Sequence, residues 1–408
     1  MSETQNFIIL GGSGAGLGVA HSFLKHIEPE LRKLGKKYHL YIIDSSSHFF
    51  WNTGSPRSVV SAALLPAEKL FAPIADGFKS YDSSLYTVIH GTAVSWDVGG
   101  RTVTVELAND QNTQTTLPYY ALVLATGTRT PSPATSLHGD HTITKAAIED
   151  LNKKFASAVS VIVSGGGPTG VEVAGEAGHF LNGSAGWFSS RPSNPKAKVT
   201  LVTNRDKLLP VLSKPRALTA EIYLNQVGVD VVYNVSVVSS TTDADGKTTV
   251  HLSNGEQWTA DVYIPAWGIT PNSSYAPADL KNDQGYIKTN HATLRAEAAG
   301  PRVYVAGDVG DYSRGGFHNL YATIPVIVAN IKRDLLEAAT SSDGSDSQPN
   351  EPDRLFTPNN SETQAVPIGP RGVGAVNGWG LPSFLIWLVK GRDYMIRNVS
   401  ATVNGNMV

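Results

Sequence analysis

The chain has 408 residues, enough for two or three domains, and its 41% hydrophobic content is ample for a packed core. A formal charge of −2 argues against a nucleic-acid-binding surface, which requires clustered Lys and Arg side chains. The absence of cysteine excludes disulfides, iron–sulfur clusters and a dithiol relay, so any electron transfer requires a bound organic cofactor.

The N-terminal part begins with a strand, a turn and a helix. Residues 7–10 form an unbroken apolar run, which is typical of a buried parallel strand, and a helix is expected over residues 17–34. The turn between them consists of Gly11, Gly12, Ser13, Gly14, Ala15 and Gly16. Further strands are predicted at 38–43, ending at Asp44, at 102–107, and at 121–124, closed by Ala125, Thr126 and Gly127.

The same pattern returns later in the chain. Residues 159–163 are apolar except for Ser160, and a helix to about residue 181 follows the turn formed by Gly165, Gly166, Gly167, Pro168, Thr169 and Gly170. Strands are predicted at 199–202, 229–233, 248–252, 262–268 and 302–308. A helix is expected over 324–339, and the polar segment that follows it is typical of a loop or linker.

Both glycine-rich turns have the features of a dinucleotide site. Glycines let the backbone turn tightly and approach a pyrophosphate, while the following helix directs free N–H groups and its positive dipole end at the phosphates. Such turns also occur in sheets that bind nothing, so a single one is a weak signal. Two of them in one chain favour a protein that binds two dinucleotides.

Two acidic residues stand at strand ends where a nucleotide would lie. Asp44 can accept hydrogen bonds from ribose hydroxyls, although a helix cap or a turn would also explain it. Asp308, after Gly307, can hold the ribityl chain of a flavin, and an ordinary turn is the alternative.

Taken together, these motifs resemble the flavoprotein superfamily with two dinucleotide-binding domains. Within it, the chain most resembles fungal apoptosis-inducing-factor-like (AMID-type) NAD(P)H oxidoreductases, over nearly its whole length. The resemblance rests on residues 47–52 with Pro56 and Arg57, and on residues 69–74, 313–316 and 390–395. It implies FAD on the first and last segments and NAD(P)H on the middle one.

The resemblance also implies the residues that bind the cofactors. The two turns supply Gly11 to Gly16 and Gly165, Gly167 and Gly170, joined by Asp44, Arg57, Ala125, Thr126, Gly127, Arg205, Gly307 and Asp308. His48, Trp51, Arg57 and His318 are polar or aromatic candidates near the implied flavin, and ordinary packing is the alternative for each. No metal site is expected, because the His residues are scattered without ligand spacing.

Three departures from the family pattern bear on function. Ser13 replaces the second glycine of the first turn, and we expect FAD to bind despite its small Cβ. Trp267 stands where related proteins often have Thr, beside the implied nicotinamide pocket, where it would narrow the pocket, stack on a ring or pack in the core. Arg205 follows the second strand of the middle unit, where no acid is present; this favours NADPH weakly, with a solvated surface Arg as the alternative.

Glu172 is the strongest catalytic candidate, followed by Trp267 and His48. Family members place the Glu172 carboxylate near the flavin and nicotinamide, where it would position the carboxamide or tune the flavin. Glu176 lies one turn later on the same helical face. The alternative is an acid of the first helical turn, stabilised by the helix dipole.

The N-terminus has no charged or apolar signal region, and no apolar stretch reaches the ~20 residues of a membrane helix. A cytoplasmic protein is therefore expected. The apolar stretch 381–390 has two interpretations: packing over the flavin domain, or an interfacial helix that makes a peripheral membrane contact and admits a quinone.

The sequence thus predicts an α/β fold with two Rossmann-like domains. Residues 1–140 and 272–340 would form the FAD domain, 141–271 the NAD(P)H domain, 341–365 a linker and 366–408 a C-terminal segment. The predicted activity is hydride transfer from NAD(P)H to flavin, followed by reduction of a quinone or similar small acceptor. The alternatives are a flavin-dependent tailoring enzyme acting on an aromatic small molecule, and a nucleotide-binding signalling protein with little turnover.

Overall fold

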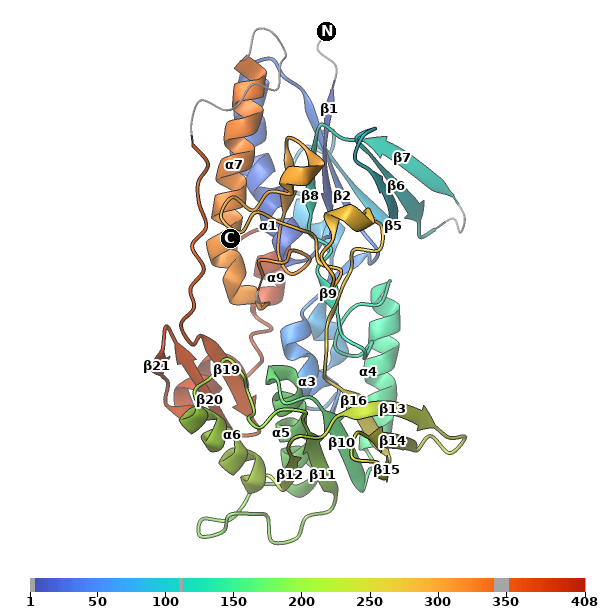
Figure 1. Ribbon diagram of the computed structural model, residues 1–408, viewed down its shortest axis with the longest axis vertical. Coiled ribbons are helices and arrows are strands. Elements are labelled where there is room, and N and C mark those ends of the chain that lie inside the picture. The colour runs from blue at the N-terminus through green and yellow to red at the C-terminus, as the bar shows by residue number, and fades with distance from the viewer. Residues whose placement is uncertain (1–3, 110–112, 314, 341–351, 408) are drawn as a thin grey trace.

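The computed structural model describes residues 4–109, 113–313, 315–340 and 352–407, and it contains two α/β units along its long axis (Figure 1). The upper unit in this view is built on a seven-stranded sheet. In sheet order its strands are β18 (Val303–Val305), β8 (Ala121–Leu124), β1 (Gln5–Leu10), β2 (Tyr38–Asp44), β5 (Tyr86–Asp97), β6 (Thr102–Leu107) and β7 (Gln114–Pro118). The five strands from β18 to β5 run parallel, as in a Rossmann-like sheet, and the α/β prediction is confirmed.

Helices cover this sheet because its central strands are apolar on both faces. Phe7, Ile8 and Ile9 are fully buried, and so is the whole of β8. The predicted helix after the first turn begins at Gly14, inside the glycine motif, and runs as α1 (Gly14–Ser22), a π-helical turn (Phe23–Ile27) and α2 (Glu28–Lys33). It packs beside α7 (Leu320–Thr340).

The lower unit repeats this plan on a smaller scale. Its parallel sheet has the order β12 (Val229–Val232), β11 (Lys198–Val202), β10 (Ser160–Ser164) and β16 (Val262–Pro265). Its helices are α4 (His141–Phe155), α5 (Pro168–Asn182) and α6 (Lys214–Gln226), and β13 (Val237–Thr242), β14 (Thr248–Leu252) and β15 (Gln257–Ala260) form an antiparallel sheet.

Two chain passages join the units. They pair as β9 (Thr128–Arg129) and β17 (Thr270–Pro271), which run antiparallel. The chain therefore leaves the upper sheet after β8, builds the lower unit, and returns to the upper sheet through β17. This path places the ends of β1, β8 and β18 opposite the lower unit (Figure 1).

The C-terminal segment packs across both units. It contains β19 (Gln364–Ile368), β20 (Arg371–Val376), β21 (Trp379–Gly380), α8 (Ser383–Ile386), a π-helical turn (Trp387–Gly391) and α9 (Asn398–Val403). The strand β19 packs on α5 of the lower unit, whereas α9 packs on α1 of the upper unit. It also contacts β4 (Phe71–Pro73), which pairs with β3 (His48–Phe50) just before α3 (Ser55–Ser58).

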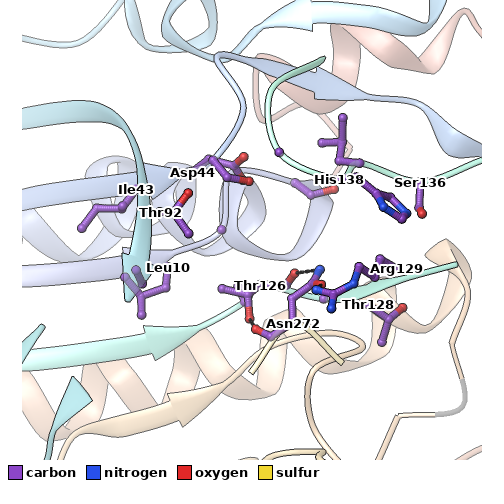
Figure 2. A pocket seen from close by; sticks show the side chains of 18 of the residues that line it. Leu10, Ile43, Asp44, Thr92, Thr126, Thr128, Arg129, Ser136, His138 and Asn272 are labelled. Atoms are coloured by element: carbon purple, nitrogen blue, oxygen red, sulfur yellow. Dashed lines mark hydrogen bonds between the residues drawn. The ribbon is translucent and has the colours of Figure 1, made fainter. Parts of the chain in front are cut away.

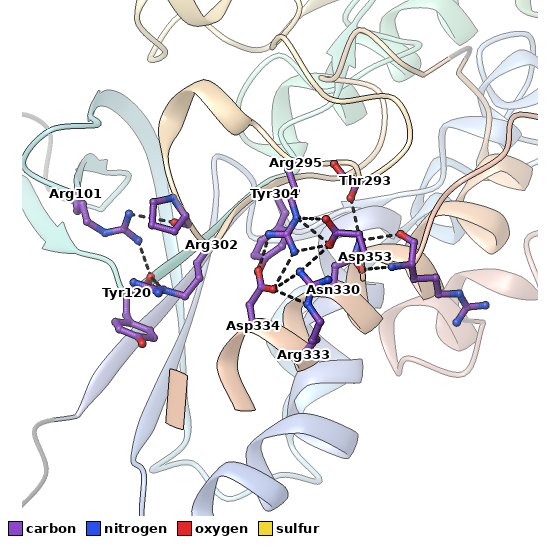
Figure 3. Close-up of polar contacts among 12 residues, drawn as sticks. Arg101, Tyr120, Thr293, Arg295, Arg302, Tyr304, Asn330, Arg333, Asp334 and Asp353 are labelled. Carbon is purple, nitrogen blue, oxygen red and sulfur yellow. Dashed lines mark hydrogen bonds and ion pairs between the residues drawn. The ribbon is translucent and has the colours of Figure 1, made fainter. Parts of the chain in front are cut away.

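Part of the predicted linker is held by an ionic cluster. Residues 341–351 lie outside the described residues, but Asp353 just beyond them pairs with Arg295 and Arg333, at 2.8 and 2.9 Å (Figure 3). Both arginines also pair with Asp334 of α7. The chain around residue 353 is therefore fixed to the upper unit.

No helix in the described ranges is long and apolar enough to cross a bilayer.

Candidate functional site

A cavity of about 450 Å³ opens at the carboxyl ends of the upper sheet's strands. Figure 2 shows Asp44 and His138 on one side of it and Thr126, Arg129 and Asn272 on the other. Carboxyl ends of parallel strands are where open α/β sheets bind ligands. The cavity is therefore the first place to test for a nucleotide.

The first glycine turn lines this cavity and leaves no room for larger residues. Gly11 has φ of +112°, and a Cβ there would collide with the carbonyl of Ala125; a Cβ at Gly16 would collide with the carbonyl of Gly11. Gly14 and Ala15 form the first turn of α1, and Ala15 packs against Gly307. The start of α1 thus faces the cavity with free N–H groups, which suits a pyrophosphate.

Asp44 stands at the cavity wall and holds the turn. Its carboxylate accepts the N–H of Gly12 at 2.5 Å and that of Ser46 at 2.8 Å. Removal from water raises the pKa of Asp44, while these two hydrogen bonds oppose the rise. The carboxylate oxygens have further lone pairs for ribose hydroxyls, as the sequence predicted for this position.

The Ala125–Gly127 turn is locked to the returning passage. Thr126 donates its hydroxyl to the carbonyl of Asn272 at 2.6 Å, and Asn272 donates its amide to the carbonyl of Thr126 at 2.9 Å. Arg129 contacts the side-chain oxygen of Asn272 at 3.1 Å and lines the cavity. The sequence analysis did not identify Arg129 and His138 as cavity residues. Their position shortly after the turn at Gly127 was the signal that could have identified them.

Asp308 also lines the cavity, at the end of β18. It accepts the hydroxyl of Ser313 at 2.7 Å, and Gly307 before it has φ of +77°. Arg314, between Ser313 and Gly315, lies outside the described residues. A glycine turn, an acid at the end of β2 and an acid at the end of β18 surround one elongated cavity, so the residues present fit FAD.

The second glycine turn has the same backbone. Gly165 has φ of +122° and faces the carbonyl of Ala266, and a Cβ at Gly170 would collide with the carbonyl of Gly165. Gly167 caps α5 and has open space where a Cβ would be. Ser13 holds the equivalent place in the first turn, so the open space at Gly167 indicates that this position of the turn has room for a side chain. The geometry of this second turn fits NAD(P)H.

Trp267 lies beside the second turn, at the end of β16. Its side chain is 47% exposed, so it does not pack in the core, and its indole N–H contacts the hydroxyl of Tyr263 at 3.3 Å. Arg205, after β11, is exposed, and its backbone N–H contacts the hydroxyl of Thr203. Both residues therefore present side chains to the solvent around the second turn.

Glu172 and Glu176 lie buried on α5 and face cations from other parts of the chain. Lys390 of the C-terminal segment donates to Glu172 at 2.5 Å. Burial raises the pKa of Glu172 from 4.5 to about 7, although Lys390 opposes the rise. The buried carboxyl group therefore holds a proton more readily than a solvent-exposed glutamate does.

Arg57 of α3 is committed to this cluster. It binds Glu176 through two hydrogen bonds of 2.9 and 2.8 Å, and it lies over the ring of Tyr394. The Tyr394 hydroxyl donates to the same carboxylate at 3.1 Å. Arg57, predicted to bind a cofactor, thus ties the upper unit to the lower unit and to the C-terminal segment; its contact with a cofactor stays a prediction.

His48 lies in a different cluster. Its ring is 3.8 Å from the ring of His141, and its Nδ1 contacts the hydroxyl of Ser47 at 2.9 Å, close to Asp140. Burial and His141 lower the pKa of His48. His318 is exposed before α7. No described contact joins either histidine to Glu172.

Trp51 connects the upper unit to the C-terminal segment. It is buried, donates its indole N–H to the carbonyl of Tyr394 at 2.8 Å, and meets the Phe317 ring edge-on at 5.0 Å.

Within the described ranges, no group of three or more His, Cys, Asp and Glu side chains could hold a metal ion.

Residues 5–328 match the family described as pyridine nucleotide-disulphide oxidoreductase. The chain is 40% identical to "Oxidoreductase phnG" of Penicillium herquei, over 97% of this chain and 95% of that protein. It is 26% identical to "Ferroptosis suppressor protein 1" of Xenopus tropicalis, over 97% and 95%. Its fold is similar to that of a sulfide:quinone oxidoreductase from Aquifex aeolicus, with a TM-score of 0.72 and 14% identity, over 98% and 92% of the two chains.

Proposed function

Because the chain belongs to the pyridine nucleotide-disulphide oxidoreductase family, we propose that it carries electrons from NAD(P)H to a quinone or a similar small aromatic acceptor. It is an FAD-dependent NAD(P)H oxidoreductase, related to the apoptosis-inducing-factor-like proteins. The family name refers to a redox disulfide, which a chain without cysteine does not have. The acceptor must therefore take its electrons without a thiol relay.

The positions of the chain's own residues support the following roles. The turn from Gly11 to Gly16 and the start of α1 would hold the pyrophosphate of FAD, Asp44 would bind a ribose, and Asp308 would bind the ribityl chain. The turn from Gly165 to Gly170 holds NAD(P)H. Bound FAD supplies the two-electron chemistry that couples oxidation of NAD(P)H to reduction of the acceptor.

The observation that carries the choice of acceptor is the buried contact between Glu172 and Lys390. Reduction of a quinone to a hydroquinone requires two electrons and two protons; one proton is transferred together with the two electrons as a hydride, and the other must come from a proton donor. Glu172, with a pKa of about 7, can hold a proton at neutral pH, and the ammonium group of Lys390 stabilises the carboxylate after the proton leaves. An acceptor that takes only electrons would need no such group.

The tailoring alternative is favoured by Trp267. An indole that is 47% exposed beside the second turn offers a face on which a planar aromatic substrate can stack. The signalling alternative predicts nucleotide binding with little turnover. Both alternatives share the two nucleotide sites, so the acceptor and the turnover rate distinguish them.

The stretch 381–390 supports a proposed peripheral membrane contact of an otherwise cytoplasmic protein. Ile386 is buried against the C-terminal strands, whereas Phe384, Trp387, Leu388 and Val389 are exposed. The segment thus packs through Ile386 and leaves four apolar side chains exposed, which suits a contact with a membrane interface. Sedimentation with lipid vesicles tests the contact; a Phe384→Ser, Leu388→Ser variant should remain in the supernatant.

The experiment that tests the function measures anaerobic oxidation of the NAD(P)H-reduced enzyme by a series of acceptors. We expect benzoquinones and naphthoquinones to reoxidise it rapidly, and one-electron acceptors to do so without dependence on Glu172. Failure of every quinone, together with tight binding of a cyclic aromatic compound, would favour the tailoring enzyme. Negligible steady-state turnover with all acceptors would favour the signalling protein.

A further inference from the structure

The two nucleotide-binding units differ at one equivalent position. In the upper unit, the residue at the end of the second strand is Asp44, which lies against Gly12 of the turn. In the lower unit, Thr203 follows β11 and lies against Gly166 in the same way. The backbone therefore places Thr203 where the upper unit has its ribose-binding acid.

This difference changes the charge that an adenosine ribose would meet. A carboxylate at this position binds the 2′ and 3′ hydroxyls and repels a 2′-phosphate. Thr203 has no charge, and its hydroxyl already contacts the N–H of Arg205 at 3.3 Å. A 2′-phosphate would thus meet no repulsion from the end of β11.

Arg205 supplies the opposite charge two residues later. Its side chain is exposed, and its guanidinium group has no hydrogen bond or ion pair with any other described residue. Its backbone is fixed, because its carbonyl accepts the N–H of Asn234 at 3.2 Å. A guanidinium group on a fixed turn can form two parallel hydrogen bonds with a phosphate.

The neighbouring charged groups do not occupy Arg205. Lys207 donates to the carbonyls of Pro210 and Leu212, so its ammonium group is bound within its own loop. Asp230 of β12 pairs with Arg191 at 2.8 Å. Asp206, next in sequence, is exposed and carries the nearest negative charge along the chain.

We propose that the second site binds NADPH in preference to NADH, with Arg205 holding the 2′-phosphate and Thr203 permitting it. The inference rests on the proposed placement of NAD(P)H at the turn from Gly165 to Gly170. It assigns the coenzyme preference to residues that do not take part in the redox step.

Binding of two nucleotide fragments without a nicotinamide tests the preference directly. Isothermal titration of the FAD-loaded protein with 2′,5′-ADP and 5′-AMP should show tighter binding of 2′,5′-ADP. Arg205→Ala should weaken 2′,5′-ADP binding roughly 10- to 100-fold and leave 5′-AMP binding unchanged, since one charge-assisted contact is lost. The matched control Lys153→Ala removes an exposed cation of α4 in the same unit and should change neither affinity.

A second variant reverses the charge. Thr203→Asp should give the lower unit an acid at the position that Asp44 holds in the upper unit, and it should shift the ratio of kcat/KM values towards NADH. Arg205→Ala should lower kcat/KM for NADPH alone. Equal affinity for the two fragments, or an Arg205→Ala variant that binds 2′,5′-ADP normally, would overturn the coenzyme inference. If neither coenzyme reduces the bound flavin, the proposed function fails instead.

Discussion

The two glycine turns have one backbone and different side chains. Gly11 and Gly165 share a positive φ, and each faces the carbonyl of the alanine that ends a neighbouring strand, Ala125 or Ala266. These constraints come from sterics alone, so they recur wherever a strand turns tightly into a helix over a phosphate.

The side chains around the two turns differ in charge. The upper unit has an acid at the end of β2, and the lower unit has Thr203 followed by Arg205. The lower helix carries Glu172, whereas α1 has Gly18 at the same distance from its turn. Under the proposed assignment, the upper site would retain the flavin, and the lower site would have the protonatable carboxyl group of Glu172 on its helix.

The contact between the units gives the largest expected effect. Arg57→Ala leaves the buried carboxylate of Glu176 without its bidentate partner, which should lower the free energy of unfolding by about 3–5 kcal/mol. Urea denaturation of the FAD-loaded protein measures this. Arg57→Lys keeps the charge and should lose less; an Arg57→Ala variant as stable as the parent would show that the contact does not join the units.

Alanine substitutions in the two turns should separate the two nucleotides. Gly165→Ala requires a Cβ at φ of +122° against a carbonyl, a strain of about 3 kcal/mol, so flavin reduction by NADPH should slow roughly 100-fold. The variant should retain its FAD, as absorbance of the purified protein will report. Gly11→Ala should instead lose FAD. Loss of flavin from Gly165→Ala would contradict the assignment of the second turn.

Glu172 should give the acceptor step its pH dependence. A group that donates a proton with a pKa of about 7 should make quinone reduction fall about tenfold per pH unit above that value. Glu172→Gln should abolish this dependence. Because Lys390 lowers the pKa of Glu172, Lys390→Met should move the decline to higher pH. Stopped-flow rates from pH 5 to 9 measure both effects, and an unchanged profile in Glu172→Gln would exclude the role.

The smallest effect is expected at the residue that departs from the glycine pattern. Ser13 makes no side-chain hydrogen bond to α1, and the equivalent Gly167 has open space around it. Ser13→Gly should therefore change the FAD dissociation constant by less than about threefold, or ~0.7 kcal/mol. Titration of the apoprotein with FAD checks this, and a large gain in affinity would mean that the serine obstructs the pyrophosphate.

Local patterns made the fold predictable. The strands that end at Leu10 and Ser164 are short, largely apolar runs followed by glycines. Both the apolar run and the glycine-rich turn can be recognised from neighbouring residues alone. The helix after the first turn begins earlier than predicted, at Gly14, because the glycine motif itself forms its first turn.

The partners of the candidate residues were not predictable. Lys390 lies 218 residues from Glu172, and Arg57 lies 119 residues from Glu176, so no local spacing connects them. The sequence identified Glu172 and Arg57 but not the ion pairs that they form. For Trp267, the sequence did not decide between a place beside the nicotinamide pocket and a place in the core. The structure shows that the indole is half exposed.

Anaerobic titration of the purified protein with NADPH tests the central claim most directly. The account predicts that the protein carries FAD, and that about one equivalent of NADPH bleaches its long-wavelength absorbance. A protein that neither retains nor takes up FAD, or a bound flavin that neither NADPH nor NADH bleaches, would contradict it.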